Sequence, residues 1–175
     1  MNRRRALLAL GGLGLTGTSA WVLRNDVGGS DDALPMRVET LDAPGSTAGA
    51  TSVPPENTVT LVDLFATWCA ACEEQMVALT AIRETYGDEV AMVSVTNERL
   101  GGSLTKTDLR DWWRDHDGAW TLGLDPASDL MSALGAGSIP HLAIFDAAGE
   151  VHWQEGGLTD EESLRTEIDR ALGEA

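Results

Sequence analysis

Residues 58–72 read Thr-Val-Thr-Leu-Val-Asp-Leu-Phe-Ala-Thr-Trp-Cys-Ala-Ala-Cys. The first part, 58–66, is β-branched or apolar apart from Asp63, a pattern typical of a buried strand. In the following residues, 70–86, apolar side chains recur at helical spacing, which predicts a helix. The Cys69–Cys72 pair is therefore expected at the turn from a buried strand into a helix.

Further strands and helices are predicted on both sides of this turn. Residues 36–41 alternate and are expected to form an edge strand, whereas 43–57 are dense in Gly, Ser, Thr and Pro and are expected to be a loose connection. Strand–helix alternation followed by a hairpin and a helix predicts an α/β sandwich around a mixed sheet. The other expected strands are 90–96, 120–124, 141–145 and 151–154, and the other helices are 107–116, 125–135 and 159–173.

Two of these helices carry start signals. Asp125-Pro126 predicts a short helix with the acid as its cap and the proline in its first turn. Thr159-Asp160-Glu161-Glu162 predicts a capping box, with Thr159 as the first residue of the box. Gly135 and Gly173 are expected to end the two helices.

The first 24 residues predict an export signal or a membrane anchor. Arg3, Arg4 and Arg5 precede an uncharged stretch, 6–23, that is rich in Leu, Gly and Ala. The arginines and the leucines that follow are similar to a twin-arginine signal, which exports folded proteins. With the arginines retained inside, residues 25–35 form a flexible spacer and a domain at 36–175 lies outside the cytoplasm, anchored or secreted. A buried helix of the main domain is the alternative for the N-terminal stretch.

The charge of the chain is strongly unbalanced. There are 28 acidic against 12 basic residues, a net charge of -16, and Lys106 is the only lysine. Such a surface repels phosphate, so no nucleic-acid partner is expected. The composition favours a halophilic acidic protein, because concentrated salt screens its self-repulsion, with an acidic protein from an ordinary habitat as the alternative.

The cysteine spacing points to thiol chemistry. Two cysteines are too few for a disulfide scaffold. The free N–H groups at the start of a helix favour a thiolate at Cys69, and Cys72 returns to the same helical face. A zinc site would need two more ligands, and His116, His141 and His152 do not form a suitable pair.

Three ordered motifs resemble thioredoxins. Residues 62–72 are similar to their active-site segment, Ser138-Ile139-Pro140-His141-Leu142 to the loop with their cis-proline, and 145–150 to the hairpin that follows. Together with the N-terminal segment, the chain resembles TlpA-like extracytoplasmic thiol–disulfide oxidoreductases. The resemblance implies a thioredoxin-like three-layer sandwich, a central mixed β-sheet flanked by helices, over residues 36–175.

The resemblance assigns chemical roles to three residues. Cys69 is the expected nucleophile and Cys72 the resolving cysteine, and the two form a disulfide when oxidised. Asp63 matches the buried acid of the family, whose pKa burial would raise, and it is expected to take the proton of Cys72. An ordinary aspartate at the end of a strand is the alternative for Asp63.

The resemblance also assigns the substrate-binding surroundings. Pro140 is expected to be cis and to face the cysteines, and Ile139 to offer backbone contacts to a substrate strand. Trp68 is expected to shield the nucleophile. The alternatives are an ordinary trans proline and a tryptophan packed in the core. No cofactor and no metal are expected.

The chain departs from the family after the cysteines. Ala70-Ala71 separates the cysteines without a proline or a histidine. Many relatives continue with an acid, methionine and proline, where this chain has Gln75, Met76 and Val77. Glu73 and Glu74 suit a helix start but oppose a thiolate at Cys69.

The resulting function is disulfide exchange with exported protein thiols and disulfides, including apocytochrome c as for some relatives, with a membrane electron donor or acceptor. The alternative is a metal-binding module, such as a copper carrier that uses Cys69 and Cys72. A peroxidase is disfavoured because Ala66 stands where a threonine is needed. Trp112-Trp113 is expected to pack in the core or cleft wall, His141 to be hydrogen-bonded or exposed, and Gly156-Gly157 to form a turn.

Overall fold

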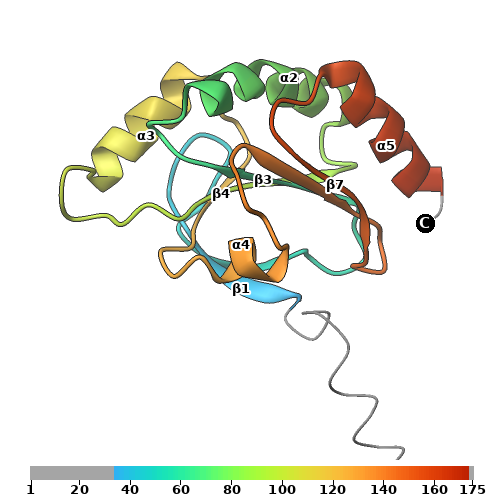
Figure 1. Ribbon diagram of the computed structural model, residues 1–175, viewed down its shortest axis with the longest axis horizontal. Coiled ribbons are helices and arrows are strands. Elements are labelled where there is room, and N and C mark those ends of the chain that lie inside the picture. Colours follow the sequence, from blue (N-terminus) through green and yellow to red (C-terminus); the bar gives the residue numbers. More distant parts are fainter. Residues whose placement is uncertain (1–33, 174–175) are drawn as a thin grey trace, which may run out of the picture.

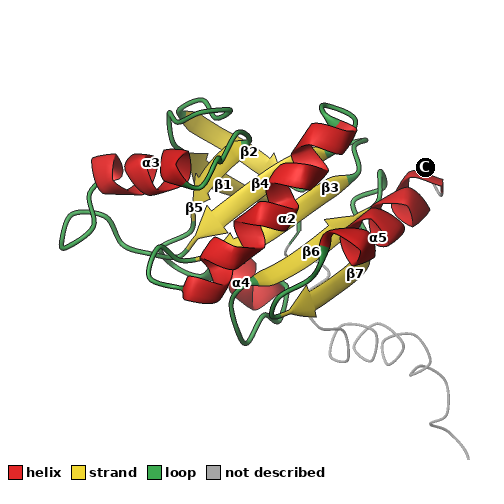
Figure 2. Ribbon diagram, turned by 90° about the horizontal axis from the view of Figure 1, so that it is seen from above, coloured by secondary structure: helices red, strands yellow, loops and turns green. Residues whose placement is uncertain are grey.

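The computed structural model describes residues 34–173, which form a seven-stranded mixed sheet with helices on both faces (Figure 1, Figure 2). The predicted signal or anchor, 1–24, and nearly all of the spacer, 25–35, lie outside the described residues. The strands are β1 Met36–Thr40, β2 Gly49–Val53, β3 Thr60–Phe65, β4 Ala91–Thr96, β5 Thr121–Leu124, β6 His141–Phe145 and β7 Val151–Gly156. The helices are α2 Ala70–Tyr86, α3 Lys106–Asp115, α4 Asp129–Ala133 and α5 Glu161–Gly173.

The three layers follow the predicted architecture. Figure 1 and Figure 2 show α2, α3 and α5 over one face of the sheet and α4 on the opposite face. The strand order is β2-β1-β5-β4-β3-β6-β7. The thioredoxin-like sandwich around a mixed sheet is therefore confirmed.

The central strand β3 places the start of α2 over the middle of the sheet. It pairs in parallel with β4 and antiparallel with β6, and all six of its residues are buried. Leu61 and Phe65 pack in the cluster that contains the cysteines, whereas Val62 and Leu64 pack in the cluster of α4. Because side chains alternate along a strand, Asp63 lies on the same face as Leu61 and Phe65, the face covered by α2.

The edge of the sheet differs from the prediction. β1 is an internal strand, because it pairs antiparallel with both β2 and β5, and β2 is the edge strand. β2 lies within 43–57, which was predicted to be loose. Its sequence, Gly-Ala-Thr-Ser-Val, lacks an apolar alternation, so its strand conformation depends on the pairing with β1.

Both predicted helix starts are shifted. α4 begins at Asp129, and Asp125 caps it from the preceding turn, where its carboxylate accepts the N–H groups of Asp129 at 3.1 Å and Leu130 at 2.9 Å. Pro126 therefore lies before the helix. At α5 the cap is Asp160, which accepts both the N–H and the hydroxyl of Ser163, so the prediction of Thr159 as the first residue of the box is wrong by one residue.

Candidate active site

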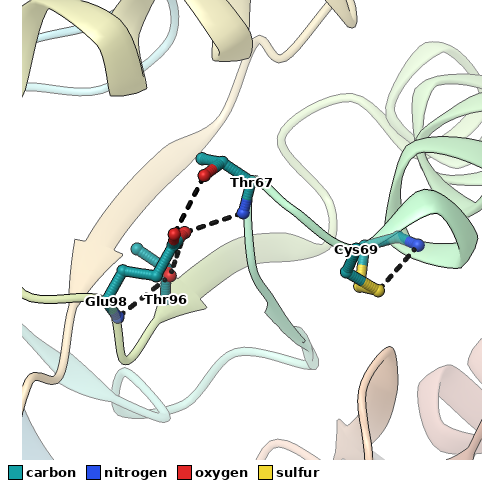
Figure 3. Close-up of a disulfide and its surroundings, with 5 residues drawn as sticks. Thr67, Cys69, Thr96 and Glu98 are labelled. Atoms are coloured by element: carbon teal, nitrogen blue, oxygen red, sulfur yellow. Dashed lines mark hydrogen bonds between the residues drawn. A yellow bond between two sulfur atoms is a disulfide. The ribbon is translucent and has the colours of Figure 1, made fainter. Parts of the chain in front are cut away.

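The two cysteines form a disulfide at the start of α2, as the sequence predicts, with their Cα atoms 5.2 Å apart (Figure 3). Cys69 is the N-cap residue of α2, and its sulfur accepts the N–H of Cys72 at 3.2 Å. Cys69 is 8% exposed and Cys72 only 2%. The helix thus directs an N–H group at the sulfur that is more accessible to a partner, which favours negative charge on Cys69 after reduction.

Trp68 lies on the surface directly before Cys69. Its side chain is 73% exposed, so the alternative of core packing is wrong. The chain turns here, with the N–H of Cys69 donating to the carbonyl of Ala66 at 3.1 Å. An exposed indole beside Cys69 offers a flat apolar surface to a polypeptide partner.

A glutamate that the sequence analysis missed holds the segment before the cysteines. Glu98 follows β4, and its carboxylate accepts the N–H of Thr67 at 2.7 Å and the Thr67 hydroxyl at 2.9 Å. It also accepts the hydroxyl of Thr96 at 3.1 Å, and Figure 3 shows the carboxylate between the two threonines. No local pattern identifies Glu98, because the strands bring it to Thr67 from 31 residues away along the chain.

Asp63 is buried beneath the cysteine helix. It is 3% exposed, and its Oδ2 accepts the hydroxyl of Ser94 at 2.8 Å. Ser94 in turn accepts the indole N–H of Trp120 at 2.9 Å. Burial raises the pKa of Asp63 from 3.8 to about 7, and the hydrogen bond from Ser94 acts against this rise.

The second oxygen of Asp63 is available for proton transfer. Oδ1 is buried and has no hydrogen-bond partner among residues 34–173. A buried carboxylate with an unpaired oxygen and a pKa near neutrality can both take and return a proton at physiological pH. This environment differs from that of an ordinary aspartate at a strand end, because the side chain points into the core beside Phe65.

The loop before β6 has the predicted cis-proline. The Ile139–Pro140 peptide bond is cis, and the carbonyl of Pro140 accepts the N–H of Gly157 at 2.8 Å. A Cβ at Gly156, in β7, would lie 2.8 Å from the hydroxyl of Ser138, so any larger residue there would require this hydroxyl to move. Gly157 has a φ of 99° and makes the turn that follows β7.

The remaining candidate residues have structural roles. His141 is buried, and its Nε2 lies 3.1 Å from Oε1 of Gln154, so it is hydrogen-bonded as expected. Trp113 is fully buried, and Trp112 stacks on Phe65 with ring centroids 4.9 Å apart, which confirms their packing role. Glu73 and Glu74 are exposed, so water screens their effect on Cys69.

Metal-binding and membrane-spanning features were also sought in the described part of the chain. Within residues 34–173, no three His, Cys, Asp or Glu side chains form a group suited to hold a metal ion. In the same range, no helix is long and apolar enough to cross a membrane.

Comparisons with known proteins point to one superfamily. Residues 30–172 match the Redoxin family. The chain is 26% identical over 116 residues to the thiol-disulfide oxidoreductase YkuV of Bacillus subtilis. The aligned segment covers 66% of this chain and 78% of YkuV.

Solved structures share the fold. StoA from Bacillus subtilis matches with a TM-score of 0.61 at 19% identity, covering 77% of this chain and 98% of StoA. A secreted Mycobacterium tuberculosis disulfide oxidoreductase homologous to DsbE of E. coli matches with a TM-score of 0.65 at 11% identity, covering 80% of this chain and 98% of that protein.

Proposed function

Because the chain belongs to the Redoxin family, as a TlpA-like thiol–disulfide oxidoreductase of the thioredoxin superfamily, we propose that it exchanges disulfides with exported proteins through Cys69 and Cys72. The observation that carries the proposal is the placement of the Cys69 sulfur at the N-terminus of α2, above the buried Asp63 face of the sheet. Cys69 is the nucleophile, Cys72 resolves, and Asp63 exchanges the proton of Cys72.

The exchange proceeds in two displacements. In the reduced protein, the Cys69 thiolate attacks one sulfur of a substrate disulfide, forming a mixed disulfide and releasing the other substrate sulfur as a thiolate. Cys72 then gives its proton to Asp63 and attacks the Cys69 sulfur, which releases the second substrate thiolate. Two electrons pass from the cysteine pair to the substrate, and the reverse sequence oxidises a substrate dithiol.

Two elements are proposed to bind the substrate. One is the exposed indole of Trp68, next to Cys69 in the chain, and the other is the backbone of the loop with Ile139 and cis-Pro140. An extended substrate segment beside Ile139 would present its cysteine to Cys69.

We further propose that residues 1–24 export or anchor the protein, that 25–35 form a spacer, and that the domain works outside the cytoplasm. Export before disulfide exchange implies a membrane electron donor or acceptor, and apocytochrome c is one candidate substrate. Support comes from the basic and apolar N-terminal composition and from the shared fold of a secreted disulfide oxidoreductase. Immunoblotting of membrane fractions tests the anchor: protein of mature size that is washed free by carbonate contradicts it.

The reduction potential of the Cys69–Cys72 couple tests the exchange function. A value near about −270 mV indicates a reductant supplied with electrons across the membrane, and one near about −120 mV an oxidant that installs disulfides. Cys72→Ser should accumulate a mixed disulfide on Cys69, whereas Cys69→Ser should form none. A wild-type protein without any reversible dithiol–disulfide couple rules out the proposal.

A further inference from the structure

Gln75 connects the cysteine helix to a distant loop through both ends of its amide. It lies one turn after Cys72 in α2 and is 1% exposed. Its Nε2 donates to the carbonyl of Thr159 at 2.9 Å, and its Oε1 accepts the N–H of Thr159 at 2.8 Å. The amide therefore pairs with both backbone groups of a residue 84 positions away in the chain.

The loop held by Gln75 also holds the cis-proline. Gly157, two residues before Thr159, donates its N–H to the carbonyl of Pro140 at 2.8 Å. Hydrogen bonds thus run from α2 to Thr159, and from Gly157 to the cis-proline loop. The resolving cysteine and the backbone expected to receive the substrate are joined through this path.

An amide can make both bonds at every pH, because it carries a donor and an acceptor and does not ionise. An ionised carboxylate of the same length can accept the N–H of Thr159 but has no hydrogen to donate to the carbonyl of Thr159. Two oxygens would then face each other without a shared hydrogen in a buried place, which is unfavourable. Because Gln75 is an amide, its link to Thr159 does not depend on the protonation of this side chain.

We propose that Gln75 is a positioning residue that holds the Gly157–Thr159 loop, and with it cis-Pro140, at the distance from Cys69 and Cys72 that a polypeptide substrate requires. The proposal rests on the proposed function, since it concerns how the substrate strand is bound. Both hydrogen bonds of the Gln75 amide go to the backbone of Thr159, so in this proposal Gln75 acts on binding of the substrate backbone and leaves the thiol chemistry unchanged.

The test compares a peptide with a small reagent. Reduced full-length protein, wild type or with Gln75→Leu or Gln75→Glu, is reacted with a disulfide-bonded peptide and, separately, with the small linear disulfide bis(2-hydroxyethyl) disulfide. Only the peptide is long enough to lie along the cis-proline loop. Titration of Cys69 and Asp63 changes both second-order rate constants by the same factor, because both groups act in both reactions. The ratio of the two rate constants is therefore independent of this titration.

The two variants have different expected pH profiles. Gln75→Leu should lower the peptide-to-reagent ratio by about tenfold at every pH, as expected for the loss of two buried hydrogen bonds. Gln75→Glu should match the wild-type ratio at acid pH, where its protonated carboxyl group restores both bonds, and should fall toward the Leu value as it ionises. The neighbouring acids Glu74, Asp160, Glu161 and Glu162, with Asp63 from β3, shift this transition to higher pH.

Val77→Glu is the matched control. Val77 is exposed on α2, so this variant adds the same charge to the same helix without touching Thr159, and its ratio should stay at the wild-type value. If Gln75→Leu does not fold, the pH dependence of the peptide-to-reagent ratio in Gln75→Glu tests the proposal by itself. A ratio that is flat with pH in Gln75→Glu, or a Leu variant that slows both reactions equally, overturns the proposal. A wild-type protein that reacts with neither disulfide overturns the proposed function instead.

Discussion

Ser94 donates its hydroxyl hydrogen to Asp63 over 2.8 Å from the neighbouring strand β4. The indole N–H of Trp120 donates to the Ser94 oxygen at 2.9 Å, and this second hydrogen bond orients the Ser94 hydroxyl toward Asp63. Oδ2 of Asp63 therefore accepts a hydrogen bond from an oriented donor, whereas Oδ1 has no partner among the described residues and can accept a proton. The environment of the expected base thus comes from three separate segments of the chain.

Replacement of Asp63 by asparagine should slow the resolution of the mixed disulfide. In the wild type, the resolution rate should rise as the pH passes about 7, because only the ionised carboxylate can accept the proton of Cys72. Asp63→Asn should lose this rise and be about a hundredfold slower at pH 8, in the range of general-base effects. Stopped-flow measurement of thiol release from a Cys69 mixed disulfide gives the profile, and an unchanged profile would reject Asp63 as the base.

Replacement of Ser94 should move that profile without abolishing it. The Ser94 hydrogen bond lowers the pKa of Asp63, so Ser94→Ala should raise this pKa further and shift the rise in rate to higher pH. Ser132→Ala removes an exposed hydroxyl on α4 and is the matched control. A shift to lower pH in Ser94→Ala would contradict the role of the bond.

Asp63 should also make the stability of the protein depend on pH. Its folded pKa, about 7, lies above the unfolded value of 3.8, so the folded state binds the proton more tightly. The contribution of Asp63 is therefore fully present below about pH 4 and is lost as the pH rises through 7. The loss is on the order of 4 kcal/mol at 1.36 kcal/mol per pKa unit. Urea unfolding at pH 4 and pH 8 should show this change in the wild type relative to Asp63→Asn, and parallel stabilities of the two proteins would refute it.

Removal of the Glu98 carboxylate should loosen the segment before the cysteines. Glu98→Ala loses two charge-assisted hydrogen bonds to Thr67, and should lower the free energy of unfolding by about 2 kcal/mol. The loss of a negative charge near the active site should also lower the pKa of Cys69 in the reduced protein, followed by the ultraviolet absorbance of the thiolate. Glu84→Ala, on the exposed face of α2, removes the same charge and should change neither quantity. Equal behaviour of the two variants would exclude a specific role for Glu98.

The acidic surface predicts a strong dependence of stability on salt. Screening extends over only about 3 Å in 1 M salt, so molar KCl should reduce the self-repulsion of a chain of net charge -16. We expect the melting temperature to rise by about 4 °C or more relative to dilute buffer, equivalent to about 1 kcal/mol. Sucrose at matched osmolarity is the control, because it is excluded from the protein surface but does not screen charges. A melting temperature that does not rise with KCl would count against adaptation to high salt.

Much of the fold can be predicted from the sequence, because the signals for its elements lie in short stretches of the chain. The boundaries of α2 match the prediction, since helical periodicity and the glycine at its end lie within the same stretch of chain. β3 is an equally clear signal, because it is buried on both faces and consists of β-branched and apolar residues around Asp63. The Cys69–Cys72 pair and the cis-proline were recognised by their short motifs. These features need only neighbouring residues to be identified.

Other features depend on contacts between distant segments and left no local pattern. β2 becomes a strand because β1 supplies its partner, and Glu98, Ser94 and Thr159 matter only because the sheet brings them to Thr67, Asp63 and Gln75. The sequence pattern, together with the resemblance to thioredoxins, therefore identifies the cysteine pair, the buried acid and the layered fold. Which groups tune the acid, hold the cysteine segment and join α2 to the cis-proline loop is decided by tertiary structure, because a hydrogen bond forms between atoms close in space at whatever separation they have in the chain.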